Sequence, residues 1–167
     1  SLVNPDGRVL LSSAGLDLRY DFSTNLSLNA TVNPDFGQVE ADPAVLNLSV
    51  YETFFEERRP FFVEGASIFK CNNLFYSRRI GKPPGYFPAP SGVTMIDQPD
   101  ATTILGVVKL TGKTATGTSI GVLEAVTAPE YATIEEVVTD LITGQDRTER
   151  REHLIEPLTN YFVGRVQ

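Results

Sequence analysis

The 167-residue sequence contains no tryptophan, one cysteine and one histidine. So few cysteine and histidine residues leave little material for a zinc site or a Cys/His catalytic pair. Basic residues are also in the minority: 14 Lys and Arg stand against 21 Asp and Glu, a formal net charge of −7. Because a protein that binds nucleic acid normally presents a basic face, we expect no nucleic-acid partner.

Long apolar runs are missing as well. No stretch approaches the roughly 18 apolar residues of a membrane-spanning helix, so the sequence predicts none. This does not exclude membrane β-barrels, because their strands alternate apolar and polar residues and never produce such a run. With 41% hydrophobic and 21% charged residues, the composition also excludes a disordered tail, a collagen-like repeat and a coiled coil.

Alternation of apolar and polar residues is clearest near the start of the chain. Every second residue from Leu16 to Phe22 is apolar, and the same pattern runs from Leu26 to Val32 after a polar turn at 23–25. This period of two is typical of strands with one apolar and one polar face. We therefore predict a β-hairpin over residues 14–33.

A second hairpin is predicted over residues 103–127. The segments ILGVVKLTG and SIGVLEAVT are rich in β-branched residues, and the turn-like KTATGT separates them. A fifth strand is expected to start within residues 159–167.

Two long connections remain, and both are predicted as loops, over 34–102 and 128–158. In the first, residues 44–56 fit either a strand or a helix. In the second, IEEVVTDLI (134–142) favours a short helix, and DRTERRE (146–152) reads as a solvated charge run.

Short and long connections thus alternate along the chain, as they do in outer-membrane barrels. We predict one all-β region over residues 1–167, an antiparallel meander that forms part of an outer-membrane-type β-barrel with two long loops. Five strands cannot close such a barrel, which needs at least eight. On this interpretation the chain is the N-terminal part of a larger barrel, completed by remaining strands of the protein or by other subunits.

Four ordered motifs carry a family resemblance across nearly the whole chain. They are NPDFGQVEADP (33–43), ETFFEERRPFFVEG (52–65), LFYSRRIG (74–81) and EPLTNYFVGR (156–165). In these motifs the chain resembles a bacterial family known as domain of unknown function 5916. Its members look like outer-membrane β-barrels, typically preceded by a domain similar to family-nine carbohydrate-binding modules. The resemblance implies the outer membrane of a Gram-negative bacterium, contact with membrane lipid, and glycan-like ligands.

Charged residues concentrate in the first long connection. The set consists of Glu56, Glu57, Arg58, Arg59, Glu64, Arg78 and Arg79. Two arginine pairs beside phenylalanine doublets could grip an anionic ligand bidentately. Because acids and bases are nearly balanced, we favour a buried ion-pair network that holds the loop inside or over the barrel.

Other candidate chemistry is weaker. Asp35, Glu40 and Asp42 could hold Ca²⁺, although their spacing misses the EF-hand pattern. No other metal or cofactor is expected. Glu57 and Glu64 could be the two carboxyls of a glycosidase, but with so many acidic residues some pair always fits. Cys71 is a lone thiol whose partner the sequence does not identify. We therefore expect no catalytic residues.

The alternation of apolar and polar residues fits two different functions. The favoured one is a non-enzymatic segment of an outer-membrane barrel that serves uptake, export or surface binding of glycan-like ligands. The alternative is a soluble β-sandwich that binds carbohydrate, with the apolar face buried in a protein core. In the barrel, lipid would contact Leu16, Leu18, Leu26, Leu28 and Val32, and the lumen would contact Asp17, Arg19, Asp21, Asn29 and Thr31.

Overall fold

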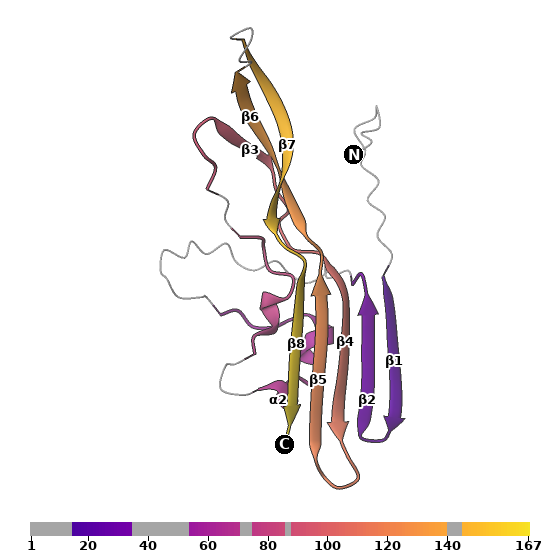
Figure 1. Cartoon of the computed structure of the whole chain (residues 1–167). Helices are drawn as coiled ribbons and strands as arrows, with labels where there is room; N and C mark the ends of the chain where they lie inside the picture. The colour runs from indigo at the N-terminus through magenta and orange to yellow at the C-terminus, as the bar shows by residue number, and fades with distance from the viewer. Residues whose placement is uncertain (1–14, 35–53, 71–74, 86–87, 140–144) are drawn as a thin grey trace.

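The structure, a computed structural model, describes residues 15–34, 54–70, 75–85, 88–139 and 145–167. Within these residues the chain is mainly β-structure, and every strand pairing is antiparallel (Figure 1). The strands form two sheets. The prediction of an all-β antiparallel fold is confirmed.

The larger sheet has five strands in the order β1-β2-β4-β5-β8. Their bounds are β1 Leu16–Ser23, β2 Leu26–Val32, β4 Ile104–Lys113, β5 Ser119–Thr127 and β8 Thr159–Val166. Residues 24–25 turn the chain between β1 and β2, and residues 114–118 turn it between β4 and β5. Both short turns lie at the same end of the sheet.

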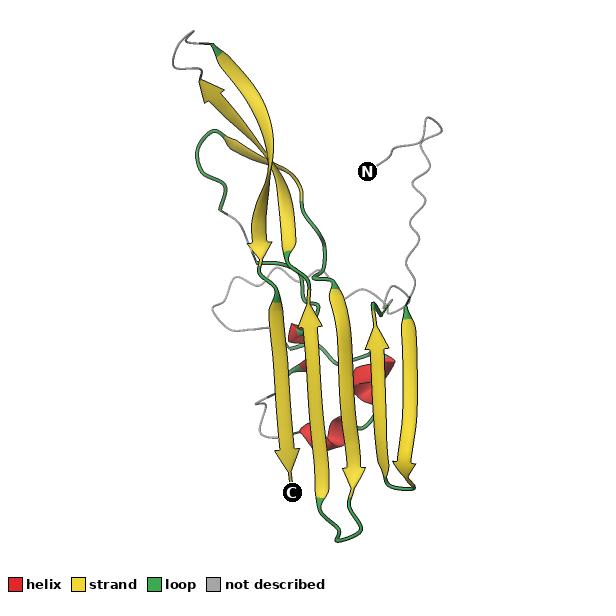
Figure 2. Ribbon diagram, turned by 45° about the vertical axis from the view of Figure 1, so that its right-hand side comes forward, coloured by secondary structure: helices red, strands yellow, loops and turns green. Residues whose placement is uncertain are grey.

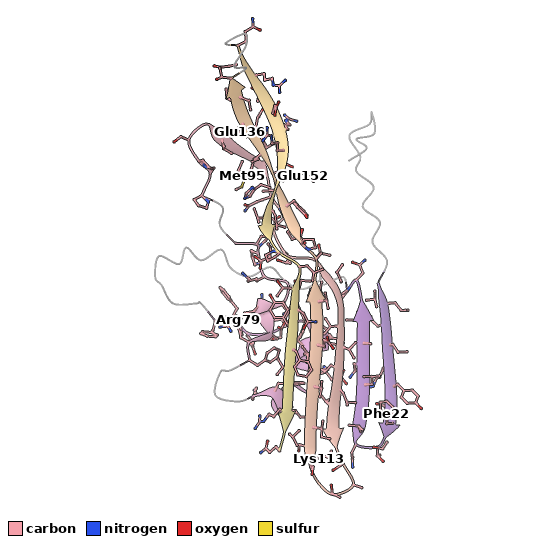
Figure 3. All side chains as sticks on the ribbon, viewed as in Figure 1. Phe22, Arg79, Met95, Lys113, Glu136 and Glu152 are labelled. Carbon is pink, nitrogen blue, oxygen red and sulfur yellow. The ribbon has the colours of Figure 1, made fainter. Side chains whose placement is uncertain are left out.

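The smaller sheet has three strands in the order β3-β6-β7 and extends beyond the opposite end of the larger sheet (Figure 2). Its strands are β3 Val93–Asp97, β6 Glu130–Thr139 and β7 Asp146–Glu156. Figure 3 shows this separation: Phe22 and Lys113 lie on the larger sheet near the short turns, and Glu136 and Glu152 lie on the smaller sheet.

The expected loop over 128–158 is therefore wrong, and so is the short helix over 134–142. β-branched residues of β6, among them Thr133, Val137 and Val138, favour a strand, and β6 pairs with β7 along its whole length. The charges of β7 fit a strand because the side chains of Arg147 and Arg151 both bind Glu149 between them.

The first long connection also contains regular structure. Two four-residue helices, α1 (Pro60–Val63) and α2 (Ala66–Phe69), precede a 3₁₀ turn, η1 (Ser77–Arg79), and strand β3. Of the ambiguous range 44–56, residues 44–53 lie outside the described residues, and residues 54–56 are irregular. No helix in the described ranges is long and apolar enough to cross a membrane.

Strand register separates two faces of the larger sheet, because directly paired residues point the same way. One row runs from Leu28 through Leu110 and Val122 to Gly164. The neighbouring row runs from Asn29 through Lys109 and Leu123 to Val163, on the other face.

The helices cover the second of these faces. We call residues 54–70 and 75–85 the inserted segment; Figure 2 shows its helices behind the larger sheet. The core lies between the two, where buried side chains of the segment meet those of β4 and β5: Phe62, Phe69 and Ile80 against Ile104, Val107, Leu123 and Ala125.

Candidate functional site

The centre of the inserted segment is the side chain of Arg59, which is buried beside the ring of Phe62, 4.2 Å from its centroid. Its guanidinium donates two parallel hydrogen bonds to the Glu57 carboxylate, at 2.8 and 2.7 Å. It also donates to the main-chain oxygens of Ile80, at 2.6 Å, and Ser77, at 2.9 Å. A planar fork of donors can make these contacts together, so Arg59 joins the two halves of the segment.

Glu57 completes this cluster. The Ser77 hydroxyl donates to its carboxylate at 2.6 Å. Burial alone would raise the pKa of Glu57, but the hydrogen bonds from Arg59 and Ser77 and the charge of Arg59 outweigh it, so the pKa lies below its usual value. A general acid at neutral pH needs a raised pKa. The geometry therefore suits a structural ion pair.

A second set of contacts joins the segment to the larger sheet. Lys109 lies in the middle of β4, its side chain points to the covered face, and the residue is only 1% exposed. Its ammonium donates to the carbonyl oxygens of Phe61 and Glu64, the latter at 2.5 Å. The group also lies 4.7 Å from the Phe61 ring centroid. Lys109 therefore holds the end of α1 against the sheet.

Two arginines on the outermost strands act in the same way. Arg165 of β8 donates to the carbonyl oxygens of Ile68, at 3.0 Å, and Lys70 at the end of α2. Arg19 of β1 forms a half-exposed ion pair with the Glu64 carboxylate at 2.7 Å. The segment is thus attached to β1, β4 and β8 by one cation each.

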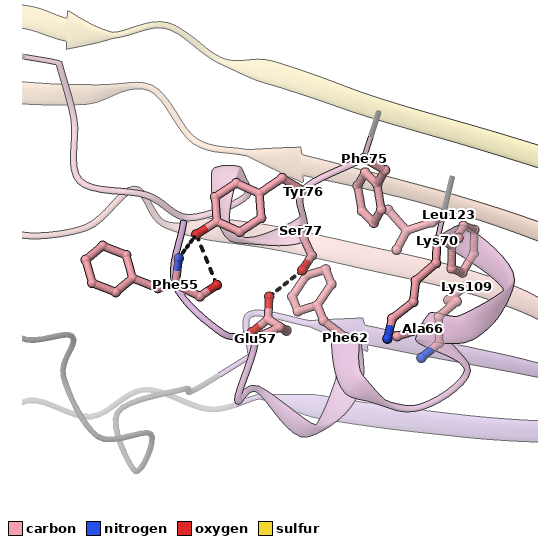
Figure 4. Close-up of a pocket in the computed structure, with 11 residues that line it drawn as sticks. Phe55, Glu57, Phe62, Ala66, Lys70, Phe75, Tyr76, Ser77, Lys109 and Leu123 are labelled. Carbon is pink, nitrogen blue, oxygen red and sulfur yellow. Dashed lines mark hydrogen bonds between the residues drawn. The ribbon is translucent and has the colours of Figure 1, made fainter. Parts of the chain in front are cut away.

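A cavity of about 180 Å³ lies between the inserted segment and the sheet (Figure 4). Its walls are mainly aromatic, with Phe62 and Phe69 on the helices and Phe75 and Tyr76 before η1. On one side of the cavity, the Tyr76 hydroxyl accepts a hydrogen bond from the Phe55 main-chain N–H and donates one to the Phe55 carbonyl oxygen. Polar groups enter from Glu57, Ser77, Lys70 and Lys109.

The structure brings part of the predicted charge set together. Glu57 and Arg59 form the cluster described above, and the Arg78 side chain donates to the main-chain oxygen of Glu56 at 3.1 Å. Glu64 pairs instead with Arg19 on the sheet, and the main-chain oxygen of Arg79 accepts from Tyr161 at 3.2 Å. Arg58 is exposed. The set is therefore divided between the segment's interior, its contact with the sheet, and its exposed surface.

The remaining candidates fall elsewhere. Asp35, Glu40, Asp42 and Cys71 lie outside the described residues. In the part of the chain that is described, no group of three or more potential ligands is placed to hold a metal ion.

Sequence reasoning missed the cations that attach the segment. Lys109 and its acceptors are 45 and 48 residues apart, and Arg165 is 95 and 97 residues from its own. The acceptors are main-chain oxygens, which no side-chain motif reveals. The one signal of these contacts in the sequence is a charged side chain within a strand that is otherwise mostly apolar.

Comparison with known proteins gives one match. No curated protein and no solved structure matches the chain. The model of a family described as Domain of unknown function (DUF5916) matches residues 6–166, nearly the whole chain, and this confirms the resemblance seen in the four motifs. The chain belongs to the DUF5916 family.

Proposed function

We propose that this chain forms part of the wall of a β-barrel in a Gram-negative outer membrane, with the inserted segment on the lumen side. The whole protein would serve uptake, export or surface binding of glycan-like solutes, the class that the family resemblance implies. The chain's own contribution is structural and not catalytic.

The observation that carries the proposal is the exposed apolar face of the larger sheet. Phe162 and Val166 on β8 are 67% and 72% exposed, and large apolar side chains on β1, β2 and β4 are exposed on the same face. They are Leu16, Leu18, Tyr20, Phe22, Val32 and Val108. The face is interrupted on β5 and β8, where the exposed Glu124 lies opposite Val108 and accepts a hydrogen bond from Asn160. An apolar patch of this extent marks an interaction site, and lipid is the partner that we propose for it.

The covered face is mixed in character. Asn29, Thr31 and Lys109 are buried there, beside the apolar core residues Val107 and Leu123. A soluble sandwich would bury its apolar face and leave the polar face in water. Polar side chains buried on one face, together with large apolar side chains exposed on the other, therefore support the barrel over the carbohydrate-binding sandwich.

Strand length agrees with a membrane wall. β4 has 10 residues and β5 has 9. At about 3.4 Å per residue and a tilt near 40°, ten residues cover about 26 Å along the membrane normal, close to the apolar band of about 25 Å on such barrels. Short turns at one end and the three-stranded sheet at the other match periplasmic turns and surface loops.

The proposal is tested by expressing the full native protein and separating membrane from soluble fractions. We expect the protein in the outer-membrane fraction, resistant to alkaline extraction, and folded only in detergent or lipid. A protein that stays monomeric in plain buffer and unfolds cooperatively there would overturn the membrane wall and favour the sandwich.

A further inference from the structure

The charge of the covered face differs from that of the chain. On β2, β4, β5 and β8, all of whose residues are described, this face presents three cations, Lys109, Lys113 and Arg165, and no carboxylate. Only β1, at the sheet edge, adds acidic residues, with Asp17 and Asp21 on either side of Arg19. A chain with a net charge of −7 thus places cations along the face where the segment lies.

The segment covers Lys109 and Arg165 mainly with uncharged groups. Lys109 and Arg165 bind main-chain carbonyl oxygens, which solvate an ammonium or guanidinium group but carry no net charge. The Glu64 carboxylate forms an ion pair with Arg19, and its charge also acts on Lys109. Across β4 and β8 the face keeps a positive potential, which in a narrow space with low-dielectric walls raises the local concentration of anions.

The order of the segment depends on the sheet beneath it. Its helices have four residues each, far fewer than a helix needs for stability in water. α2 approaches β5 at Gly121, where a Cβ atom would lie 2.4 Å from Cγ2 of Ile68 and 3.1 Å from the Phe69 ring. Docking of α2 on β5 thus requires a residue without a side chain at position 121. The cavity of about 180 Å³ beside it shows that the two surfaces are not packed throughout.

We propose that the inserted segment is a plug, and that the covered face is a cation-lined pathway which admits small anionic solutes when the plug undocks. This inference rests on the proposed barrel wall and deepens it by naming the solute charge. Lys109 and Arg165 would then have two sets of partners: carbonyl oxygens of the plug in the closed state, and anions in the open state.

The test is the ion conductance of the full native protein in planar lipid bilayers under a KCl gradient. Gly121→Val places a side chain where Ile68 packs and undocks α2 while every lining cation stays. We expect its conductance to rise several-fold over wild type, with chloride more permeant than potassium because of the lining cations. The matched control is Gly164→Val on the opposite face of β8, where a Cβ meets only the Phe162 ring at 3.6 Å; its conductance should equal that of wild type.

Two further variants keep the result interpretable. Phe69→Ala weakens the plug from its own side and should also raise the chloride conductance, even if Gly121→Val fails to fold. Arg165→Gln, added to either opening variant, should lower the chloride-to-potassium permeability ratio.

The inference is overturned if the proteins insert but both opening variants conduct no better than wild type, or if the open pathway prefers potassium. Failure of the wild-type protein to enter membranes at all would overturn the barrel wall itself. The two failures are therefore distinguishable.

Discussion

The two faces of the five-stranded sheet differ in what covers them. One face, with Leu18, Val108 and Phe162, is largely apolar and exposed, and the other, where Asn29 and Lys109 lie beside the core residues of β4 and β5, is mixed and covered. Both faces come from the same alternating strands, so alternation alone does not say which face is the interior. Which face is the interior depends on which one the connecting segment covers. Here the inserted segment binds the covered face through cations on three strands.

The largest effect is expected at Arg59, whose contacts hold the two halves of the inserted segment together. Arg59→Ala should destabilise the protein by about 3–5 kcal/mol, because it leaves the buried Glu57 carboxylate without its partner. Arg59→Lys should recover only part of this loss, since one ammonium cannot make the bidentate pair and both carbonyl contacts. Equilibrium unfolding in detergent or lipid measures both, and wild-type stability for Arg59→Lys would contradict the geometry described here.

A charge on the exposed face tests what covers it. Leu18 is 57% exposed and its cross-strand neighbour is Ala30, so in water Leu18→Arg should change stability by no more than about 0.5 kcal/mol. Facing lipid near the middle of the bilayer, it should cost about 2–4 kcal/mol. Val137→Arg on the three-stranded sheet, where Val137 is 54% exposed, is the matched control and should be neutral. Equal unfolding free energies for the two variants in lipid vesicles would argue against a lipid-facing surface.

Acid should loosen the covering segment through Glu57. Because the folded state holds the pKa of Glu57 below its usual 4.5, the ion pair stabilises the fold fully above that value. This contribution is lost as pH falls through the lower folded-state pKa. Amide hydrogen exchange in residues 57–63, corrected for its intrinsic pH dependence, should accelerate below about pH 4. Glu57→Gln should remove that part of the acid response and Glu64→Gln should keep it; the reverse result would place the titration elsewhere.

The smallest effect is expected on the three-stranded sheet. The pKa of Glu149 lies below its usual value because Arg151 donates a hydrogen bond to its carboxylate and Arg147 adds its charge. Glu149 is partly exposed and both arginines are more than half exposed, so solvent screens these interactions. Glu149→Gln should leave the thermal midpoint unchanged, in contrast to Arg59→Ala. A clear loss of stability would show that this sheet depends on its charges.

The sequence predicts those parts of the fold that depend on local pattern. Residues 16–32 form the expected hairpin because their alternation is uninterrupted. β6 and β7 were not predicted, because charged residues mask the period of two; β7 is largely exposed, and only the first half of β6 has a buried face, with Glu130, Ala132 and Ile134. Glu57 and Arg59 are two residues apart and could be paired from sequence. The contacts of Lys109 and Arg165 could not, since they join main-chain oxygens to strands far along the chain.

The most direct test of the central claim is the accessibility of single spin labels along β2 in the full native protein in lipid vesicles, with Cys71 replaced. Labels at positions 28, 30 and 32 should respond to oxygen dissolved in the bilayer and not to an aqueous nickel chelate. Labels at 27, 29 and 31 should show little response to bilayer oxygen. This alternation would place the apolar face in the hydrocarbon. Free access of the nickel chelate to positions 28, 30 and 32 would contradict the account.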